Sequence, residues 1–259
     1  MAWQWPLCAT SLRLILAGVL LALTLPIHAL MLRRHPRDIG QEPDGRSNAA
    51  GDRPRVTADD PGMTLSEALH DASFWWLSAA FLLATLATMA ITVHLIPSLI
   101  ERGYSRGFAA GAAGAIGLLG LPGRLIFTPL GSVVPRQIVT AVIFLLQTLS
   151  LVVLLAVDST VGVIAFVVLF GAGFGAITPA RAALVADLYG PKHYGSISGV
   201  LAMCVTGARS VAPIGAGLLI TSLDSYRPML WILVAASAIA AVAALKAKPT
   251  PSSITQHGQ

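Results

Sequence analysis

Two arginines that lie inside long apolar stretches are the residues of this sequence most suited to binding a ligand. Arg209 lies near the middle of one such stretch, and Arg124 follows a Pro-Gly pair in another. A charge in hydrocarbon costs about 2.5–3.5 kcal/mol on insertion scales, so each side chain must face protein or a water-filled cavity. A guanidinium presents a planar fork of donors that suits a carboxylate. We therefore expect both arginines to bind an anionic substrate.

Each of these residues also has a structural interpretation. Arg209 would then be bonded to helix carbonyls or would snorkel toward the membrane surface, and Arg124 would hold the cytoplasmic end of its helix. His94 presents a similar choice. An unperturbed histidine titrates at about pH 6.5 and can exchange protons during coupled transport. Alternatively, the ring lies near the outer membrane surface and is bonded to a backbone carbonyl.

Acidic residues are absent from the middle of every apolar stretch. Asp187 lies in the same cytoplasmic connection as Arg181, and the two are expected to form a gate-side ion pair or a solvated loop pair. The two cysteines, Cys8 and Cys204, are far apart, and no cluster of histidine and cysteine exists. No nucleophile–base pair is evident either. We expect no metal, no cofactor and no enzymatic activity.

Membrane-spanning helices must position these residues. Hydrophobic residues make up 55% of the 259-residue chain and charged residues 11%, with a mean hydropathy of +0.75, whereas a soluble domain carries about 25% charged residues. A crossing helix needs about 20 apolar residues. The sequence therefore predicts an all-α integral membrane protein with seven transmembrane helices. They are expected near 12–32, 73–99, 107–131, 137–157, 160–180, 195–222 and 228–246.

The basic residues orient these spans. With the polar segment 33–72 in the cytoplasm, twelve of the 17 lysines and arginines lie on that side and three on the other, while Arg13 and Arg209 lie within spans. This bias follows the positive-inside rule. It places the N-terminus outside and the C-terminus in the cytoplasm, in a cell (inner or plasma) membrane. The net charge of +5 is explained by this orientation and needs no nucleic-acid partner.

The expected organisation is one span, a linker and six further spans. Residues 1–32 form the first transmembrane helix, 33–72 a flexible cytoplasmic linker, 73–248 a six-helix unit and 249–259 a cytoplasmic tail. Basic residues follow the first apolar run, which favours a true span over a signal peptide. Thr64 and Glu67 have the spacing of a capping box, which predicts a short interfacial helix before the six-helix unit.

Glycines recur every three residues in the third span, at Gly111, Gly114, Gly117, Gly120 and Gly123. In a helix this spacing forms a shallow groove that lets a neighbouring backbone approach closely. A glycine-rich nucleotide-binding loop is the alternative, but no strand precedes the run. The glycines within 171–175 are expected to pack in the same way and to permit bending.

Several short runs resemble transporters of the bacterial major facilitator superfamily, in particular relatives of the monocarboxylate and oxalate/formate carriers. Residues 32–40, LRRHPRDIG, resemble the start of the central loop of that family. Residues 93–97 and 123–127 resemble helices seven and eight, and 194–199 and 212–217 resemble helix eleven. The resemblance implies helices six to twelve of a twelve-helix fold. It also implies a substrate-contacting arginine in helix eight, which Arg124 matches.

One run departs from the family pattern. Between helices eight and nine the family often has a signature of roughly GPLADRxGRR, whereas residues 128–137 here are TPLGSVVPRQ. Ser132 stands in place of the acid and Val133 in place of the first base, which leaves Arg136. Most of the ion pairs that hold the cytoplasmic helix ends in the family are therefore expected to be missing.

We expect secondary active transport of a small solute, an organic anion such as a monocarboxylate, by alternating access with symport or antiport. Arg124 and Arg209 would face the central cavity between two halves. The resemblance implies that the first five helices are missing, so a missing N-terminal half or a second copy is the expected partner within the bilayer. The alternatives are a seven-helix membrane sensor or receptor and an inactive, truncated transporter.

Overall fold

The computed structural model describes residues 18–19, 21–26 and 62–248. The chain divides into two compact units, Met1–Thr57 and Ala58–Gln259. In the first unit the described residues are helical. The rest of the span expected at 12–32, residues 33–61 of the expected linker and the tail at 249–259 lie outside the described residues.

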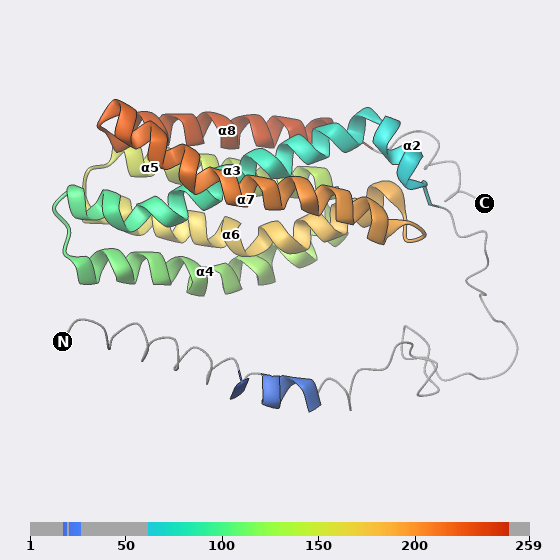
Figure 1. The fold of residues 1–259 in the computed structure, drawn as a ribbon, viewed down its shortest axis with the longest axis horizontal. Helices are drawn as coiled ribbons and strands as arrows, with labels where there is room; N and C mark the ends of the chain where they lie inside the picture. The colour runs from blue at the N-terminus through green and yellow to red at the C-terminus, as the bar shows by residue number, and fades with distance from the viewer. Residues whose placement is uncertain (1–17, 20, 27–61, 249–259) are drawn as a thin grey trace, which may run out of the picture. The chain divides into compact units, whose positions relative to one another are not determined.

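Six helices between residues 62 and 248 are long and apolar enough to cross a membrane (Figure 1). They are α3 Ala72–Glu101, α4 Arg106–Val133, α5 Arg136–Ala156, α6 Thr160–Tyr189, α7 Tyr194–Leu223 and α8 Tyr226–Lys246. Each of the last six expected spans corresponds to one of these helices. The prediction for 160–180 was too short, because α6 continues to Tyr189.

The extension of α6 has an amphipathic pattern that the charged residues concealed. Leu184, Val185 and Leu188 are buried in it, with the spacing of one helix face. The helix ends at Gly190, whose φ of 73° is readily adopted only by glycine. The sequence predicted that Asp187 lies in a connecting loop, and this was wrong, because Asp187 lies on α6.

The predicted short helix is present as α2, Leu65–His70; its position at the membrane surface stays a prediction. The Thr64 N–H donates to Glu67 Oε2 at 2.7 Å, and the Glu67 N–H donates to Thr64 Oγ1 at 3.3 Å. The capping box is confirmed, and these hydrogen bonds hold the pKa of Glu67 below its usual value. α2 precedes α3 at one end of the six-helix unit, which we call the α2 end; we call the opposite end, where α3 terminates before Arg102, the Arg102 end (Figure 1).

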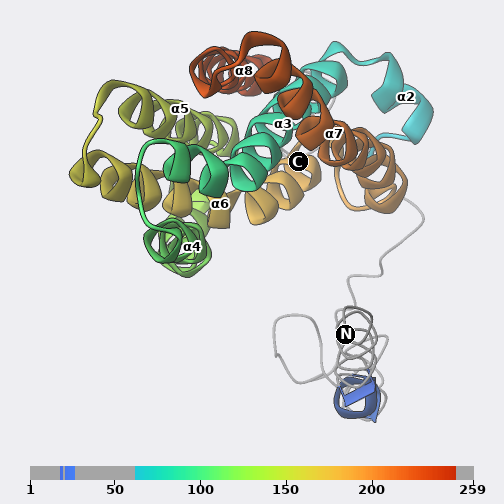
Figure 2. The same cartoon turned by 60° about the vertical axis from the view of Figure 1, so that its left-hand side comes forward.

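The long helices pack side by side in the order α4–α6–α5–α8–α3–α7, with α6 also meeting α7 and α3 meeting α4 (Figure 2). Apolar side chains fill the interior, as where the rings of Phe81 and Phe144 meet edge to face at 5.4 Å. Two buried hydrogen bonds join α5 to α3, since Gln147 Nε2 donates to Thr88 Oγ1 at 2.9 Å and to the carbonyl of Ala84 at 3.3 Å. This packing fixes which helix faces remain uncovered.

Helices α4 and α6 meet through glycines. A methyl group added at Gly123 would overlap the carbonyl of Ala172, and one added at Gly175 would overlap the carbonyl of Gly120. The predicted close approach is therefore confirmed for these positions. For the glycines nearer the start of α4 it stays a prediction, because among the described residues nothing lies within 4 Å of a methyl group built at Gly111, Gly114 or Gly117.

Candidate functional site

Helices α4 and α7 are the least covered of the six. Only 17% of the most apolar stretch of α4 and 28% of that of α7 is buried, against 44–56% in the other four helices. Arg124 of α4 and Arg209 of α7 are both exposed on these helices, as are Thr206 and Ser210 beside Arg209. Charged side chains in mid-membrane avoid lipid. The exposed face that carries the arginines must therefore meet water or another protein segment.

Arg124 is bonded to a backbone carbonyl of α6 that has no helical hydrogen-bond donor because a proline stands four residues later. Its Nε donates to the carbonyl oxygen of Gly175 in α6 at 3.4 Å. In a regular helix that oxygen would accept from the residue four positions later, but this is Pro179, which has no N–H. Among the described residues the terminal Nη atoms of Arg124 make no hydrogen bond. One edge of the guanidinium is thus positioned while its outer fork stays available.

Arg209 and Arg181 lie close enough for their charges to repel. Arg181 belongs to α6 and is half-buried, while Arg209 is exposed on α7. In the part of the chain that the structure describes, neither side chain forms a hydrogen bond or an ion pair. Two neighbouring guanidinium groups without a carboxylate create a positive potential that an anion would relieve.

His94 joins α3 to α7 through the backbone of Pro213. Its Nε2 lies 3.2 Å from the carbonyl oxygen of Pro213, which follows Arg209 by one helical turn. Because a carbonyl only accepts, Nε2 is the donor in this contact. The ring also lies 6.4 Å from that of Tyr226. The carbonyl-bonded interpretation of His94 is confirmed, and its part in proton coupling stays a prediction.

The expected pair of Arg181 with Asp187 is wrong. Residues six apart on a helix lie on different faces and are about 9 Å apart along the axis. Asp187 instead pairs with Arg136 of α5, whose Nη1 lies 2.9 Å from Asp187 Oδ1. The charge of Arg181 interacts with that of Arg209 instead. Sequence spacing alone could have excluded the predicted pair, but not identified the true partner.

Arg136 links three helix ends at the α2 end. Its Nη1 donates to the carbonyl of Ala183 in α6 at 2.9 Å, and its Nε donates to the carbonyl of Gly131 in α4 at 3.4 Å. The same side chain borders a cavity of about 160 Å³ between α4, α5 and α6. The sequence contains one indication that Arg136 links these helix ends: it is the basic residue that remains of the GPLADRxGRR pattern in residues 128–137.

We expect Arg136→Ala to destabilise the protein more than Asp187→Asn. The first change removes two hydrogen bonds to carbonyls and an ion pair, worth about 2 kcal/mol together. The second removes only the pair, whose side chains are 35% and 45% exposed, and should cost about 1 kcal/mol or less. Thermal unfolding in detergent measures both. Equal losses would mean that the carbonyl contacts do not stabilise the helix ends.

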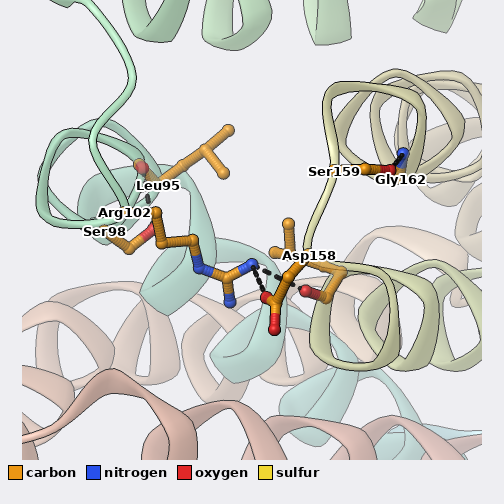
Figure 3. Close-up of polar contacts among 7 residues, drawn as sticks. Leu95, Ser98, Arg102, Asp158, Ser159 and Gly162 are labelled. Atoms are coloured by element: carbon orange, nitrogen blue, oxygen red, sulfur yellow. Dashed lines mark hydrogen bonds and ion pairs between the residues drawn. The ribbon is translucent and has the colours of Figure 1, made fainter.

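A second arginine joins helix ends at the Arg102 end (Figure 3). Arg102 Nη1 donates to the carbonyl of Leu154 at 2.8 Å, in the last turn of α5, and lies 3.5 Å from Asp158 Oδ1. The Asp158 side chain is 73% exposed, so the carbonyl contact is the stronger part of this link. A cation at a helix C-terminus also interacts favourably with the helix dipole.

The arrangement is suited to binding an anion. Three arginines, Arg124, Arg181 and Arg209, come from α4, α6 and α7, and the carboxylate of Asp187 is already paired. Within the described residues, no group of histidine, cysteine, aspartate and glutamate could hold a metal ion. The charge of Arg209 acts on Arg181, and His94 contacts α7 at Pro213, one turn after Arg209. Arg124 reaches α6 through Gly175.

A comparison with protein families identifies the kind of protein to which this chain is similar. A family model described as Major Facilitator Superfamily matches residues 2–213 and also residues 134–258. The two matches together cover nearly the whole chain, including all six long helices. No curated protein matches the chain significantly.

Proposed function

The chain belongs to the major facilitator superfamily, whose members carry small solutes across membranes, and we propose that its substrate is a small organic anion such as a monocarboxylate. It is a multi-pass membrane protein with membrane-length helices between residues 72 and 246. The proposed mechanism is secondary active transport by alternating access, in which the substrate site opens to each side of the membrane in turn.

One observation carries this proposal: the exposed face of α4 and α7 presents arginine without carboxylate. Arg209 and Arg181 are unpaired among the described residues, and Arg124 keeps its outer Nη atoms free there. A carboxylate binds a guanidinium through two parallel hydrogen bonds. The charges of Arg209 and Arg181 repel each other, and a neutral solute would leave this repulsion in place.

Another helical unit should cover the face of α4 and α7. We propose that residues 1–32 correspond to helix six and 73–248 to helices seven to twelve of the family fold, as in relatives of the monocarboxylate and oxalate/formate carriers. The covering unit would then be an N-terminal half or a second copy of this chain. Such a unit would keep Arg124 and Arg209 away from lipid, as charged side chains in mid-membrane require.

The distribution of basic residues supports an orientation for this transporter. The α2 end would face the cytoplasm of a cell membrane and the Arg102 end the outside, because most lysines and arginines lie on the side of residues 33–72. His94, near the outer end of the site, is the proposed proton-coupling residue. Symport and antiport are both compatible with this position.

Uptake by the full-length protein in proteoliposomes tests the substrate class. A panel of small monocarboxylates and their uncharged amides would be compared at equal concentration, with protein-free vesicles as the background. We expect at least one carboxylate to be accumulated and its amide to be neither accumulated nor inhibitory. Uptake of amides and carboxylates alike would contradict an arginine-based site. A correctly folded protein that moves no solute would favour the inactive remnant.

A further inference from the structure

Arg181 is a charged residue on the face of α6 that meets the other helices. It lies eight residues before α6 ends at Tyr189, which is about 12 Å along the helix axis. Leu184 and Leu188 follow it by three and seven residues and therefore share its helix face, and both are buried. Arg181 itself is half-buried. The helix bundle thus contains a guanidinium between mid-membrane and the α2 end.

Arg209 of the neighbouring helix α7 lies deeper in the membrane than Arg181. α7 starts at Tyr194, and Arg209 is fifteen residues further on, about 22 Å along the axis. Because α6 ends and α7 starts at the α2 end, Arg181 lies about 10 Å nearer to that end than Arg209 does (Figure 1). The charge of Arg181 interacts with both Tyr194 and Arg209, which agrees with a position between them.

The face of α7 between Arg209 and the α2 end carries small side chains. Ala202 and Gly195 precede Arg209 by seven and fourteen residues and lie on nearly the same face of the helix. Gly195 is exposed, and a methyl group built there meets nothing within 4 Å among the described residues. Ala202 lies about 12 Å from the start of α7, at the depth of Arg181. This face of α7 therefore leaves room for a small solute at that depth.

No carboxylate neutralises Arg181 within the part of the chain that the structure describes. Neither a hydrogen bond nor an ion pair of Arg181 occurs there. The acid of α6, Asp187, is already paired with Arg136 at 2.9 Å. A charged residue within a membrane protein faces a partner, water or a substrate path. Snorkelling through lipid to the membrane surface would require a lipid-facing position, which Arg181 does not have.

We propose that Arg181 forms a second anion-binding position, which the transported carboxylate occupies between Arg209 and the α2 end. The inference rests on the proposed transport of an organic anion and adds a path on one side of the membrane. Because Arg181 is nearer to the α2 end, an anion that enters or leaves there meets it before Arg209. Arg209 remains the substrate site in mid-membrane, and Arg181 raises the local concentration of anions on the α2 side of it.

The reactivity of a cysteine at position 202 measures this attraction of anions. Ala202→Cys would be made in the full chain with Cys8→Ser and Cys204→Ser. It would be modified in proteoliposomes with an anionic thiol reagent, sulfonatoethyl methanethiosulfonate, and with an uncharged one, methyl methanethiosulfonate. Arg181→Gln should lower the ratio of the anionic to the uncharged rate by about 10-fold. Arg181→Lys should keep the ratio near that of the chain with Arg181, because lysine keeps the charge.

Gly107→Cys is the matched control. Gly107 is exposed at the start of α4 and lies at the Arg102 end, far from Arg181. The ratio measured there should not respond to Arg181→Gln. The rate of the uncharged reagent shows whether Arg181→Gln has altered access to either cysteine. An unchanged ratio at position 202 would overturn the second anion-binding position.

Uptake of small carboxylates by the same proteoliposomes separates this inference from the proposed function. Arg181→Gln should raise the KM of the transported carboxylate about 10-fold, the effect of one lost hydrogen bond to a charged group. An unaltered KM would overturn the part of Arg181 in the path. A protein that takes up no carboxylate, yet keeps the reactivity at position 202 that depends on Arg181, would contradict the proposed transport and support the anion-binding position.

Discussion

Arg209→Ala should reduce the uptake of the transported anion by about 10- to 100-fold. The side chain lies exposed in the middle of α7 and makes no hydrogen bond within the described residues. A hydrogen bond to a charged group contributes about 1.5–3 kcal/mol, and each 1.4 kcal/mol corresponds to a factor of ten. Initial uptake rates in proteoliposomes, over a range of substrate concentrations, measure the loss. The uptake rate of Arg209→Lys should lie between those of Arg209→Ala and the unaltered protein, because lysine keeps the charge but lacks the planar guanidinium.

Stability separates this interpretation from a structural one. If Arg209 were bonded to helix carbonyls, its removal would delete stabilising hydrogen bonds, and the melting temperature would fall. A cavity arginine with a like-charged neighbour, Arg181, should leave the melting temperature unchanged or raise it. Arg106→Ala is the control, since Arg106 is exposed at the start of α4, away from the site. Unchanged anion uptake by Arg209→Ala would exclude a role for Arg209 in the cavity.

Gly123→Ala should destabilise the protein by about 3 kcal/mol. The added methyl group would overlap the backbone carbonyl of Ala172, which cannot move without shifting α6. Overpacking in a close-packed interior costs about 1–3 kcal/mol, and a clash with backbone belongs at the upper end. Arg124 is the next residue, so displaced helices would also separate its Nε from the carbonyl of Gly175. Thermal unfolding in detergent and uptake should both show the loss.

Gly117→Ala is the matched control on the same helix. A methyl group at Gly117 meets nothing within 4 Å in the described structure, and alanine favours a helix over glycine by up to about 1 kcal/mol. We therefore expect this variant to be as stable as the unaltered protein or slightly more so. If Gly117→Ala and Gly123→Ala lose stability equally, the close approach of α4 to α6 does not explain the effect.

Most of the fold could be predicted from the sequence because its signals are local. Long apolar runs define the helices, and the spacing of Thr64 and Glu67 defines the capping box of α2. The end of α6 was missed because charge was taken to mark the membrane boundary. The helix continues through Asp187 on an amphipathic pattern that turns its apolar residues inward.

The site was predictable as a set of residues but not as a set of contacts. The position of Arg124 depends on Pro179 releasing the carbonyl of Gly175, which requires that α4 and α6 be neighbours. The partner of Asp187 is Arg136 for the same kind of reason. Which helices pack against each other cannot be predicted from a single sequence. Proximity in the chain therefore favoured Arg181 as the partner of Asp187, and tertiary packing decided otherwise.

The most direct test of the account is whether water and substrate reach the arginine face of α7. Thr206→Cys and Val211→Cys would be made in a chain with Cys8→Ser and Cys204→Ser, and modified with a small anionic thiol reagent in proteoliposomes. Thr206 shares the face of Arg209, and Val211 is an exposed residue on the opposite, apolar face. We expect Thr206→Cys to react at least 10-fold faster and the transported carboxylate to slow it. Equal rates without protection by the carboxylate would contradict an anion-binding cavity.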